Sequence, residues 1–264
     1  MTQYAVDDLL YLMARLRDPE SGCPWDIKQD YASIAPSTLE EAYEVVDAIE
    51  KQDFVHLKEE LGDLLFQVIF YSQLGKEDGH FEFSGVVSDL VAKLIRRHPH
   101  VFPDGTLQSR VDNCHSLPID VKARWEAIKQ QERNAKGVKG VLDEVPLNLP
   151  ALSRAAKLQK RAASVGFDWA DVQGPIAKVR EELLEVEAEL VSGDSQALAD
   201  ELGDLLFAVV NIARYMKIDP EQALRHANQK FEYRFNFIEM NSPQPMEKTT
   251  IDEMNRLWEL AKTS

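Results

Sequence analysis

The clearest pattern in this chain is a helical spacing of apolar residues that occurs twice. After Glu60 the apolar positions are Leu61, Leu64, Leu65, Val68 and Ile69. This i, i+3, i+4, i+7, i+8 spacing predicts an amphipathic α-helix. The same spacing returns at Leu202, Leu205, Leu206, Val209 and Val210. No run of alternating β-branched residues interrupts it, so we expect an all-α fold of helical bundles.

The two helices belong to a longer internal repeat. The string ELGDLLF occurs at Glu60–Phe66 and again 141 residues later, at Glu201–Phe207. At the same spacing, LEEAYEVVDAI in the first half corresponds to REELLEVEAEL in the second. Weaker matches follow in the same order, KLIRR with KFEYR and RWEAIK with LWELAK. This predicts a tandem duplication of residues 1–136 and 151–264, joined by a Gly- and Pro-containing linker at residues 137–150.

A turn in each copy brings acidic residues on two helices level with one another. The helix before each ELGDLLF string stops near residues 51–53 in the first copy and at residues 192–195 in the second. If the chain folds back there, Glu44 lies level with Glu60, and Glu41 lies level with Asp63. The second copy repeats these pairs as Glu185 with Glu201 and Glu182 with Asp204. We therefore expect four carboxylates to converge in each copy.

Converging carboxylates repel one another unless a proton or a cation neutralises them. A hard divalent ion satisfies such oxygen ligands, and Mg²⁺ fits best, with Mn²⁺ as the alternative. The competing interpretation is a solvated acidic face on an ordinary bundle, and the duplicated spacing favours the metal site. Gly62 and Gly203 lie within the two helices. Because glycine costs ~1 kcal/mol in a helix interior, we expect something to approach the helix closely there.

Composition narrows the class of protein. The 264 residues suffice for one large domain or two smaller ones. With 45 acidic residues against 30 basic ones, the formal charge is −15, which argues against a nucleic-acid partner. No stretch approaches the ~18 apolar residues of a membrane helix, and the N-terminus lacks a secretory signal pattern. Cys23 and Cys114 have no metal-ligand spacing and fit a reducing cytoplasm, so we expect both to be inert.

The acidic motifs identify a family resemblance. The EExxE motif, followed after a turn by the ExxD of ELGDLLF, resembles the MazG family of nucleoside triphosphate pyrophosphohydrolases in its two-copy bacterial form. The similarity spans nearly the whole chain and includes GCPWD at 22–26, RRHPHVF at 96–102 and VGFDW at 165–169. It implies Mg²⁺-dependent hydrolysis of NTPs and dNTPs of broad base range to nucleoside monophosphate and pyrophosphate. It also implies a homodimer, or a higher homo-oligomer, that completes the helical bundle.

The resemblance assigns roles to particular residues. The metal ligands of the second copy would be Glu182, Glu185, Glu201 and Asp204, with a possible second site at Glu41, Glu44, Glu60 and Asp63. Glu181, or its counterpart Glu40, would orient or deprotonate the attacking water at the α-phosphate. The substrate contacts would be Lys178, Glu181, Asp200, Lys230, Arg234 and Trp258.

The two copies differ near these motifs. Lys178 corresponds to Ser37 in the first copy, so we expect the second copy to be the main catalytic one. The first copy still keeps Lys93, Arg97 and Trp125. The second departs from the family at Ala197, where relatives carry a lysine.

Two other classes of protein and one other set of possible metal ligands have to be weighed. A di-iron carboxylate bundle needs two ExxH motifs, and the chain has one, Glu77–His80. His98 and His100 flank Pro99, and we interpret them as capping or packing residues rather than ligands. A helical module that binds nucleotide without turnover is the third possibility, above all for the first copy.

Overall fold

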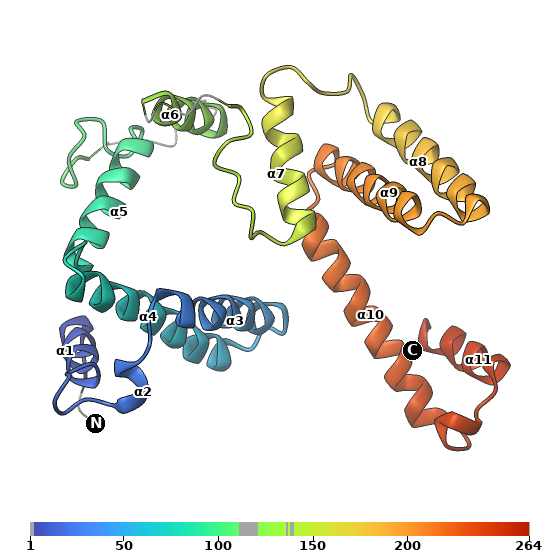
Figure 1. The fold of residues 1–264 in the computed structure, drawn as a ribbon, viewed down its shortest axis with the longest axis horizontal. Coiled ribbons are helices and arrows are strands. Elements are labelled where there is room, and N and C mark those ends of the chain that lie inside the picture. Colours follow the sequence, from blue (N-terminus) through green and yellow to red (C-terminus); the bar gives the residue numbers. More distant parts are fainter. Residues whose placement is uncertain (1–2, 111–120, 136, 138–139, 264) are drawn as a thin grey trace. The chain divides into compact units, whose positions relative to one another are not determined.

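The structure is a computed structural model, and it describes residues 3–110, 121–135, 137 and 140–263. These residues form helices and no β-strand, which confirms the predicted all-α fold. Two compact units divide the chain, Met1–Lys129 and Gln130–Ser264. The helices before the boundary are α1 (Val6–Leu16), α2 (Pro24–Ile27), α3 (Tyr31–Glu50), α4 (Phe54–Glu77) and α5 (Phe83–Arg97). Across and beyond it follow α6 (Val121–Ala135), α7 (Ala151–Ala163), α8 (Gln173–Ser192), α9 (Ser195–Tyr215), α10 (Pro220–Asn241) and α11 (Ile251–Ala261) (Figure 1).

Each unit is built on a long helical hairpin, α3–α4 in the first and α8–α9 in the second (Figure 1). The turns lie where the sequence predicts them, and both use the same cap. The Asp53 carboxylate accepts hydrogen bonds from the amides of Val55 and His56 at 3.1 Å. Its equivalent Asp194 accepts from the amides of Gln196 and Ala197 at 2.9 and 3.2 Å. These caps satisfy amides that a helix start leaves without partners, so they fix where α4 and α9 begin.

The first unit has its core where α1 crosses the C-terminal part of α4. Met13, Ile69 and Phe70 are almost fully buried there, together with Ile34 and Leu74. Arg17, at the end of α1, lies 2.6 Å from the Glu77 carboxylate and stacks its guanidinium over the Phe70 ring. Although burial raises the pKa of Glu77, hydrogen bonds from Arg17 and Gln73 hold it below its usual value. Glu77 is therefore a structural ion-pair partner, which removes the support for a di-iron site.

The second unit has α7 packed against α9 and α10, and α11 folded back on α10. A 3₁₀ turn at Met246–Lys248 separates the last two helices. Thr249 closes this bend, because its hydroxyl is 2.6 Å from that of Ser242. In the part of the chain that the structure describes, no helix is both long and apolar enough to cross a membrane.

The apolar stripes of α4 and α9 are covered along only part of their length. Ile69 and Val210 are 0% and 1% exposed, whereas Leu61 and Leu206 are 50% and 58% exposed. The helical periodicity was therefore predicted correctly, but the side chain of Leu61 is not buried against another helix of the same chain. Nothing among the described atoms comes within 4 Å of a Cβ placed on Gly62 or Gly203. The close approach expected at these glycines is absent inside the chain.

The remaining expectations concern isolated residues. His98 ends α5, and its Nδ1 lies 2.6 Å from the Leu94 carbonyl oxygen, which agrees with a capping role. Cys23 precedes α2, is half-buried and forms no disulfide. Cys114 and part of the predicted loop at residues 102–118 lie outside the described residues.

The two turns differ at the residue that adopts a left-handed conformation, and this difference predicts a stability effect. Gln52 and Gly193 are 141 residues apart and share a left-handed conformation, with φ of 57° and 75°. A side chain in that conformation costs about 1–2 kcal/mol. We predict that Gly193→Ala lowers the free energy of unfolding by about 1 kcal/mol, measured by urea denaturation. Gln52→Ala is the control and has no effect, since it exchanges one side chain for another at the same φ. Equal losses would contradict this explanation.

Candidate functional site

The hairpin of the second unit brings together three of its four predicted carboxylates. Glu182 on α8 and Glu201 and Asp204 on α9 each place one oxygen so that all three oxygens lie within 4.8 Å of one another. Glu182 is 4% exposed, Glu201 is half-buried and Asp204 is exposed, so the cluster opens toward solvent on one side. The level pairing across the turn at Gly193 accounts for this meeting. We call these three residues the second acidic cluster.

Glu185 lies beside this cluster but outside the group of three. Its carboxyl shares a hydrogen bond with that of Glu182, and this bond, burial and the charges of Glu182 and Glu201 raise its pKa above the ordinary value. Two carboxyl groups can share a hydrogen bond only if one of them holds a proton. The crowding of negative charge therefore favours the protonated form of Glu185 more than in an isolated carboxyl.

Lys178 partly neutralises the second acidic cluster. Its Nζ lies 2.6 Å from Glu182 Oε1 and 2.9 Å from Glu181 Oε1. These hydrogen bonds raise the pKa of Lys178, so the ammonium stays charged throughout the physiological range. Asp200 is exposed on α9 and accepts a hydrogen bond from Gln196 at 3.1 Å. Both Glu181 and Asp200 are therefore on the surface near the cluster.

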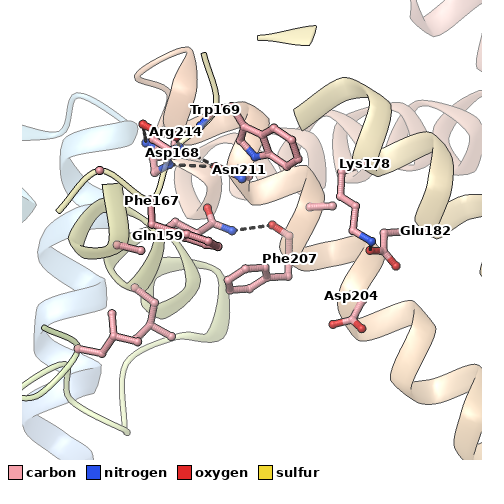
Figure 2. A pocket seen from close by; sticks show the side chains of 15 residues that line it. Gln159, Phe167, Asp168, Trp169, Lys178, Glu182, Asp204, Phe207, Asn211 and Arg214 are labelled. Atoms are coloured by element: carbon pink, nitrogen blue, oxygen red, sulfur yellow. Dashed lines mark hydrogen bonds and ion pairs between the residues drawn. The ribbon is translucent and has the colours of Figure 1, made fainter. Parts of the chain in front are cut away.

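A cavity of about 700 Å³ extends from this cluster toward α7 (Figure 2). Lys178, Glu182 and Asp204 form one side of it. The other side is formed by the VGFDW segment, α7 and α9, through Gln159, Phe167, Trp169, Phe207, Asn211 and Arg214. Its lining thus combines a charged region with aromatic rings and a few polar groups, as small-molecule sites usually do.

An ion pair and a packing contact hold the VGFDW segment, which forms part of the cavity lining, in place. Asp168 forms an ion pair with Arg214 of α9 at 2.5 Å, and the hydrogen bonds from Arg214 lower the pKa of Asp168. The ring of Trp169 lies directly on Gly174, where a Cβ would come within 2.4 Å of it. Sequence reasoning singled out VGFDW as a family string without giving it a role. It missed Gln159, Asn211 and Arg214, which carry no motif of their own.

Lys230 and Arg234, two of the predicted substrate contacts, do not line the cavity beside the second acidic cluster. Lys230 and Arg234 on α10 line a second, open cavity of about 710 Å³, together with Ala261 at the end of α11 and Lys262 just after it. The members of the second acidic cluster are not among its lining residues. The Arg234 guanidinium lies 5.4 Å from the centre of the Trp258 ring, which also contacts Phe231. Within one chain, the cations and the tryptophan therefore form a separate group.

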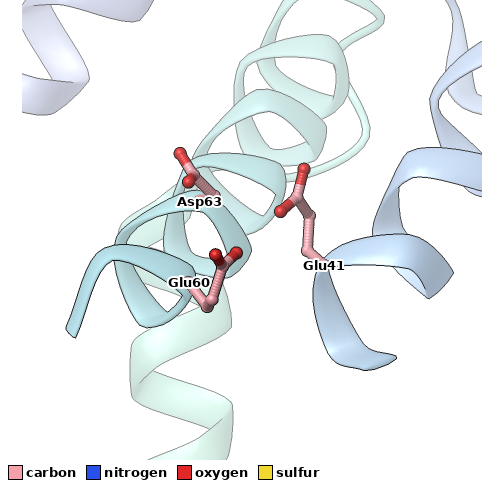
Figure 3. A group of neighbouring side chains, drawn as sticks. All are labelled: Glu41, Glu60 and Asp63. Atoms are coloured by element: carbon pink, nitrogen blue, oxygen red, sulfur yellow. The ribbon is translucent and has the colours of Figure 1, made fainter. Parts of the chain in front are cut away.

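The first unit contains a corresponding acidic cluster of Glu41, Glu60 and Asp63, whose nearest oxygens also lie within 4.8 Å of one another (Figure 3). Burial is the main reason that the pKa values of Glu41 and Glu60 are raised, and the Glu44 charge adds to both. A histidine replaces the lysine here, because His56 Nδ1 lies 3.0 Å from Glu60 Oε1. This cation carries charge only when it is protonated.

The two units differ most in the space next to these clusters. Asn211 lines the cavity of the second unit, and the residue 141 positions earlier is Phe70, which is 1% exposed in the core. Arg17 stacks on Phe70 and donates to the carbonyl oxygens of Asp26 and Gln29. An aromatic ring and a guanidinium thus fill the first unit at a position that remains open in the second.

The donor set of each cluster suits a hard divalent cation. Oxygens on opposite sides of a Mg²⁺ ion stand about 4 Å apart, given its short bonds to oxygen. The three carboxylate oxygens of each cluster lie within 4.8 Å of one another, so one such ion between them can contact all three. All ligands are carboxylates, which favour Mg²⁺ or Mn²⁺ over softer metals. The residues present therefore fit the predicted metal.

Comparisons with known proteins agree with these motifs. The profile of the MazG nucleotide pyrophosphohydrolase domain matches residues 29–102 and 172–237. The chain is 48% identical over 262 residues to the nucleoside triphosphate pyrophosphohydrolase of Escherichia coli K12, with 97% of both chains covered. It is 40% identical over 259 residues to the Thermotoga maritima nucleoside triphosphate pyrophosphohydrolase/pyrophosphatase MazG, covering 97% of this chain and 95% of that protein. It is also 43% identical over 255 residues to the uncharacterized Bacillus subtilis protein YabN, covering 95% of this chain and 50% of YabN.

The raised pKa of Glu185 predicts a dependence of stability on pH. A carboxyl whose pKa is higher in the folded chain than its ordinary 4.5 binds its proton more tightly when folded. It therefore stabilises the fold at low pH and loses this contribution as pH rises from 4.5 through the raised pKa. We predict that in a metal chelator Glu185→Gln gains thermal stability relative to wild type over this pH range.

Saturating Mg²⁺ reverses the order near neutral pH, because an ion that binds the folded cluster stabilises it in proportion to its affinity. Glu187→Gln is the control and follows wild type, because Glu187 is exposed on the same helix but, two residues further on, faces away from the cluster. Parallel curves for Glu185→Gln and wild type at all pH values would refute the predicted charge crowding.

Proposed function

Because this chain belongs to the MazG nucleotide pyrophosphohydrolase family, we propose that its second unit hydrolyses nucleoside triphosphates to nucleoside monophosphate and pyrophosphate. The observation that carries the proposal is the meeting of three carboxylates and Lys178 at one end of a cavity of about 700 Å³. A cavity of this size accommodates a nucleotide, and its charged end suits a metal-bound triphosphate. Both ribose and deoxyribose substrates of broad base range fall within the proposal.

Glu182, Glu185, Glu201 and Asp204 would hold Mg²⁺, or Mn²⁺ in its place. When bound, such an ion withdraws charge from the phosphate and lowers the pKa of water. Lys178 supplies a permanent positive charge for the α-phosphate region. Glu181, which Lys178 holds by a hydrogen bond of 2.9 Å, is positioned to orient the attacking water and take its proton. Water oxygen then bonds to the α-phosphorus, and the bond to the bridging oxygen of the leaving pyrophosphate breaks.

The remaining substrate contacts are assigned to a second subunit. Lys230, Arg234 and Trp258 surround a separate cavity in this chain. A homodimer would place these groups of one chain beside the acidic cluster of the other. The partly exposed apolar stripes support such an assembly, since Leu61 and Leu206 remain 50% and 58% exposed in the single chain. Asp200, exposed beside Glu201, completes the proposed substrate contacts.

The first unit is proposed to bind a cation without turning over substrate. It retains its acidic cluster of Glu41, Glu60 and Asp63. However, the ring of Phe70 and the guanidinium of Arg17 occupy the position that corresponds to the cavity of the second unit. His56 also offers a positive charge that varies with pH, in place of the permanent charge of Lys178.

The first test is the product of the reaction. Incubation with each nucleoside triphosphate and Mg²⁺ should release nucleoside monophosphate and pyrophosphate, measured by ion-exchange chromatography. Addition of a chelator should abolish the release. Formation of nucleoside diphosphate and orthophosphate would contradict attack at the α-phosphorus, and absence of any turnover would favour a nucleotide-binding module.

The second test assigns the active copy. Glu201→Ala should lower kcat/KM by at least about 100-fold, because even groups that only support metal ligands cost 10–100-fold when removed. Glu60→Ala is the matched change in the first unit and should leave kcat/KM within about 3-fold of wild type. Equal losses in the two variants would refute the assignment to the second unit.

The third test concerns the assembly. Light scattering after gel filtration should give at least twice the 30.0 kDa mass of one chain. Leu206→Glu, which introduces a charge on the exposed stripe, should shift the mass toward that of one chain and lower activity with it. A monomeric wild type with full activity would contradict the proposed sharing of residues between subunits.

A further inference from the structure

The cavity of the second unit contains one buried polar group with an unused hydrogen-bonding atom. Gln159, on α7, is 7% exposed, and its Oε1 accepts no hydrogen bond from any described residue. The Nε2 of the same side chain donates to the carbonyl oxygen of Phe207 at 2.8 Å. A buried acceptor without a partner costs about 1–3 kcal/mol, so it indicates a donor that arrives with a ligand.

The orientation of this amide is fixed by its neighbour. A carbonyl oxygen can only accept hydrogen bonds, so the atom facing Phe207 must be the nitrogen of Gln159. The oxygen therefore faces the cavity, on the side toward Trp169 and Asn211 in Figure 2. Gln159 thus holds, at the wall of the cavity, a buried acceptor that no described residue uses.

Asn211 presents the complementary group close by. Its Oδ1 accepts hydrogen bonds from Arg214 Nε and Nη2 at 3.0 and 2.8 Å. The N–H groups on Nδ2 of the Asn211 side chain are therefore the donors that a ligand can use. In an α-helix the backbone N–H of residue 211 donates a hydrogen bond to the backbone carbonyl of residue 207. The Gln159 side chain donates to that same carbonyl. The acceptor of Gln159 and the donors of Asn211 are thus anchored on the same turn of α9.

We infer that Gln159 and Asn211 form a nucleobase subsite that reads an adjacent donor and acceptor on the edge of the base. Such a pair is present in adenine (N6–H and N1), cytosine (N4–H and N3), guanine (N1–H and O6) and uracil (N3–H and O4). The exocyclic group is the donor in adenine and cytosine but the acceptor in guanine and uracil. Because Gln159 and Asn211 are held in fixed orientations, they match both orders only if the base turns over by about 180° between the rings that it stacks on. With this rotation, one acceptor and one donor in the protein bind every common base. Phe167, Trp169 and Phe207 line the same cavity and provide rings on which a base can stack.

The subsite rests on the proposed function, because it gives the base of a nucleoside triphosphate its place while the phosphates face Lys178 and the acidic cluster. It accounts for a broad base range by the chemistry of two amides. It also separates the units, since the equivalent of Asn211 in the first unit is the buried Phe70. The expected ligand is thus any nucleotide whose base carries an adjacent N–H and acceptor.

The first experiment changes the base and leaves the protein intact. Purine riboside triphosphate lacks the amino group of ATP and adds no bulk, so it offers no donor to Gln159. Its kcat/KM should be about 10-fold to 100-fold below that of ATP, the effect of one unmade hydrogen bond to a buried group. Inosine triphosphate carries an acceptor (O6) and a donor (N1–H) in the reverse order, so it keeps both hydrogen bonds when its base is turned over and should remain within about 3-fold of ATP. Equal rates for purine riboside triphosphate and ATP would overturn the inference while leaving the hydrolase function intact.

The second experiment locates the effect in the protein. Gln159→Met removes the amide at similar volume and should reduce the ratio between ATP and purine riboside triphosphate to within about 3-fold. Gln67→Met is the matched control, because Gln67 in the first unit is also 7% exposed with an unpartnered Oε1, and it should leave the ratio unchanged. Persistence of the full ratio in Gln159→Met, or its loss in Trp258→Ala, would place base recognition elsewhere.

Calorimetric binding of the same three nucleotides in Ca²⁺ provides a readout that needs no turnover. The affinities of wild type should rank ATP and inosine triphosphate above purine riboside triphosphate, and Gln159→Met should remove the difference. If hydrolysis is absent but this ranking is found, the proposed function fails and the subsite stands. If hydrolysis is present and the three affinities are equal, the subsite fails alone.

Discussion

The mutual repulsion of carboxylates across a helical hairpin is the constraint on which the rest of this structure depends. Three negatively charged groups held within 4.8 Å of one another raise the free energy of the folded chain unless something neutralises them. In each unit one basic side chain lies beside the cluster, Lys178 in the second and His56 in the first. One base cannot neutralise the three carboxylates of its cluster. Each cluster therefore has the set of carboxylate oxygens that a metal ion needs.

The two units show how one scaffold can be kept while its use changes. Both preserve the hairpin, the capping aspartate and the acidic residues at the same spacing. They differ in what fills the space beside the hairpin, where Phe70 and Arg17 close the first unit and Asn211 leaves the second open. A large buried ring strengthens a core, whereas a polar residue at a cavity weakens it. The first unit has thus gained packing where the second has kept room for a ligand.

The sequence predicted the elements that depend on local spacing. Helix type, the turns and the level pairing of Glu182 with Asp204 all follow from a period of 3.6 residues and a known turn position. The role of Gln159 could not be predicted, because its partner Phe207 lies 48 residues away and the contact requires α7 to cross α9. The exposure of Leu206 was equally hidden, since periodicity shows which residues share a face but not what covers it. Lys230 and Arg234 were recognised as a pair, yet only the fold separates them from the acidic cluster of their own chain.

The short turn at Gly193 has a consequence for how this protein can vary in length. Asp194 caps the start of α9 immediately after it, so the turn fixes which residues of α8 and α9 lie opposite one another. One residue inserted in α9 between the Asp194 cap and Glu201 would shift the following residues by about 1.5 Å and about 100°, carrying Glu201 and Asp204 off the face that meets Glu182. Compensation would require a second change at a distant point of the same helix. Changes in length are therefore costly between the Asp194 cap and the acidic cluster, whereas surface loops of the same chain tolerate them.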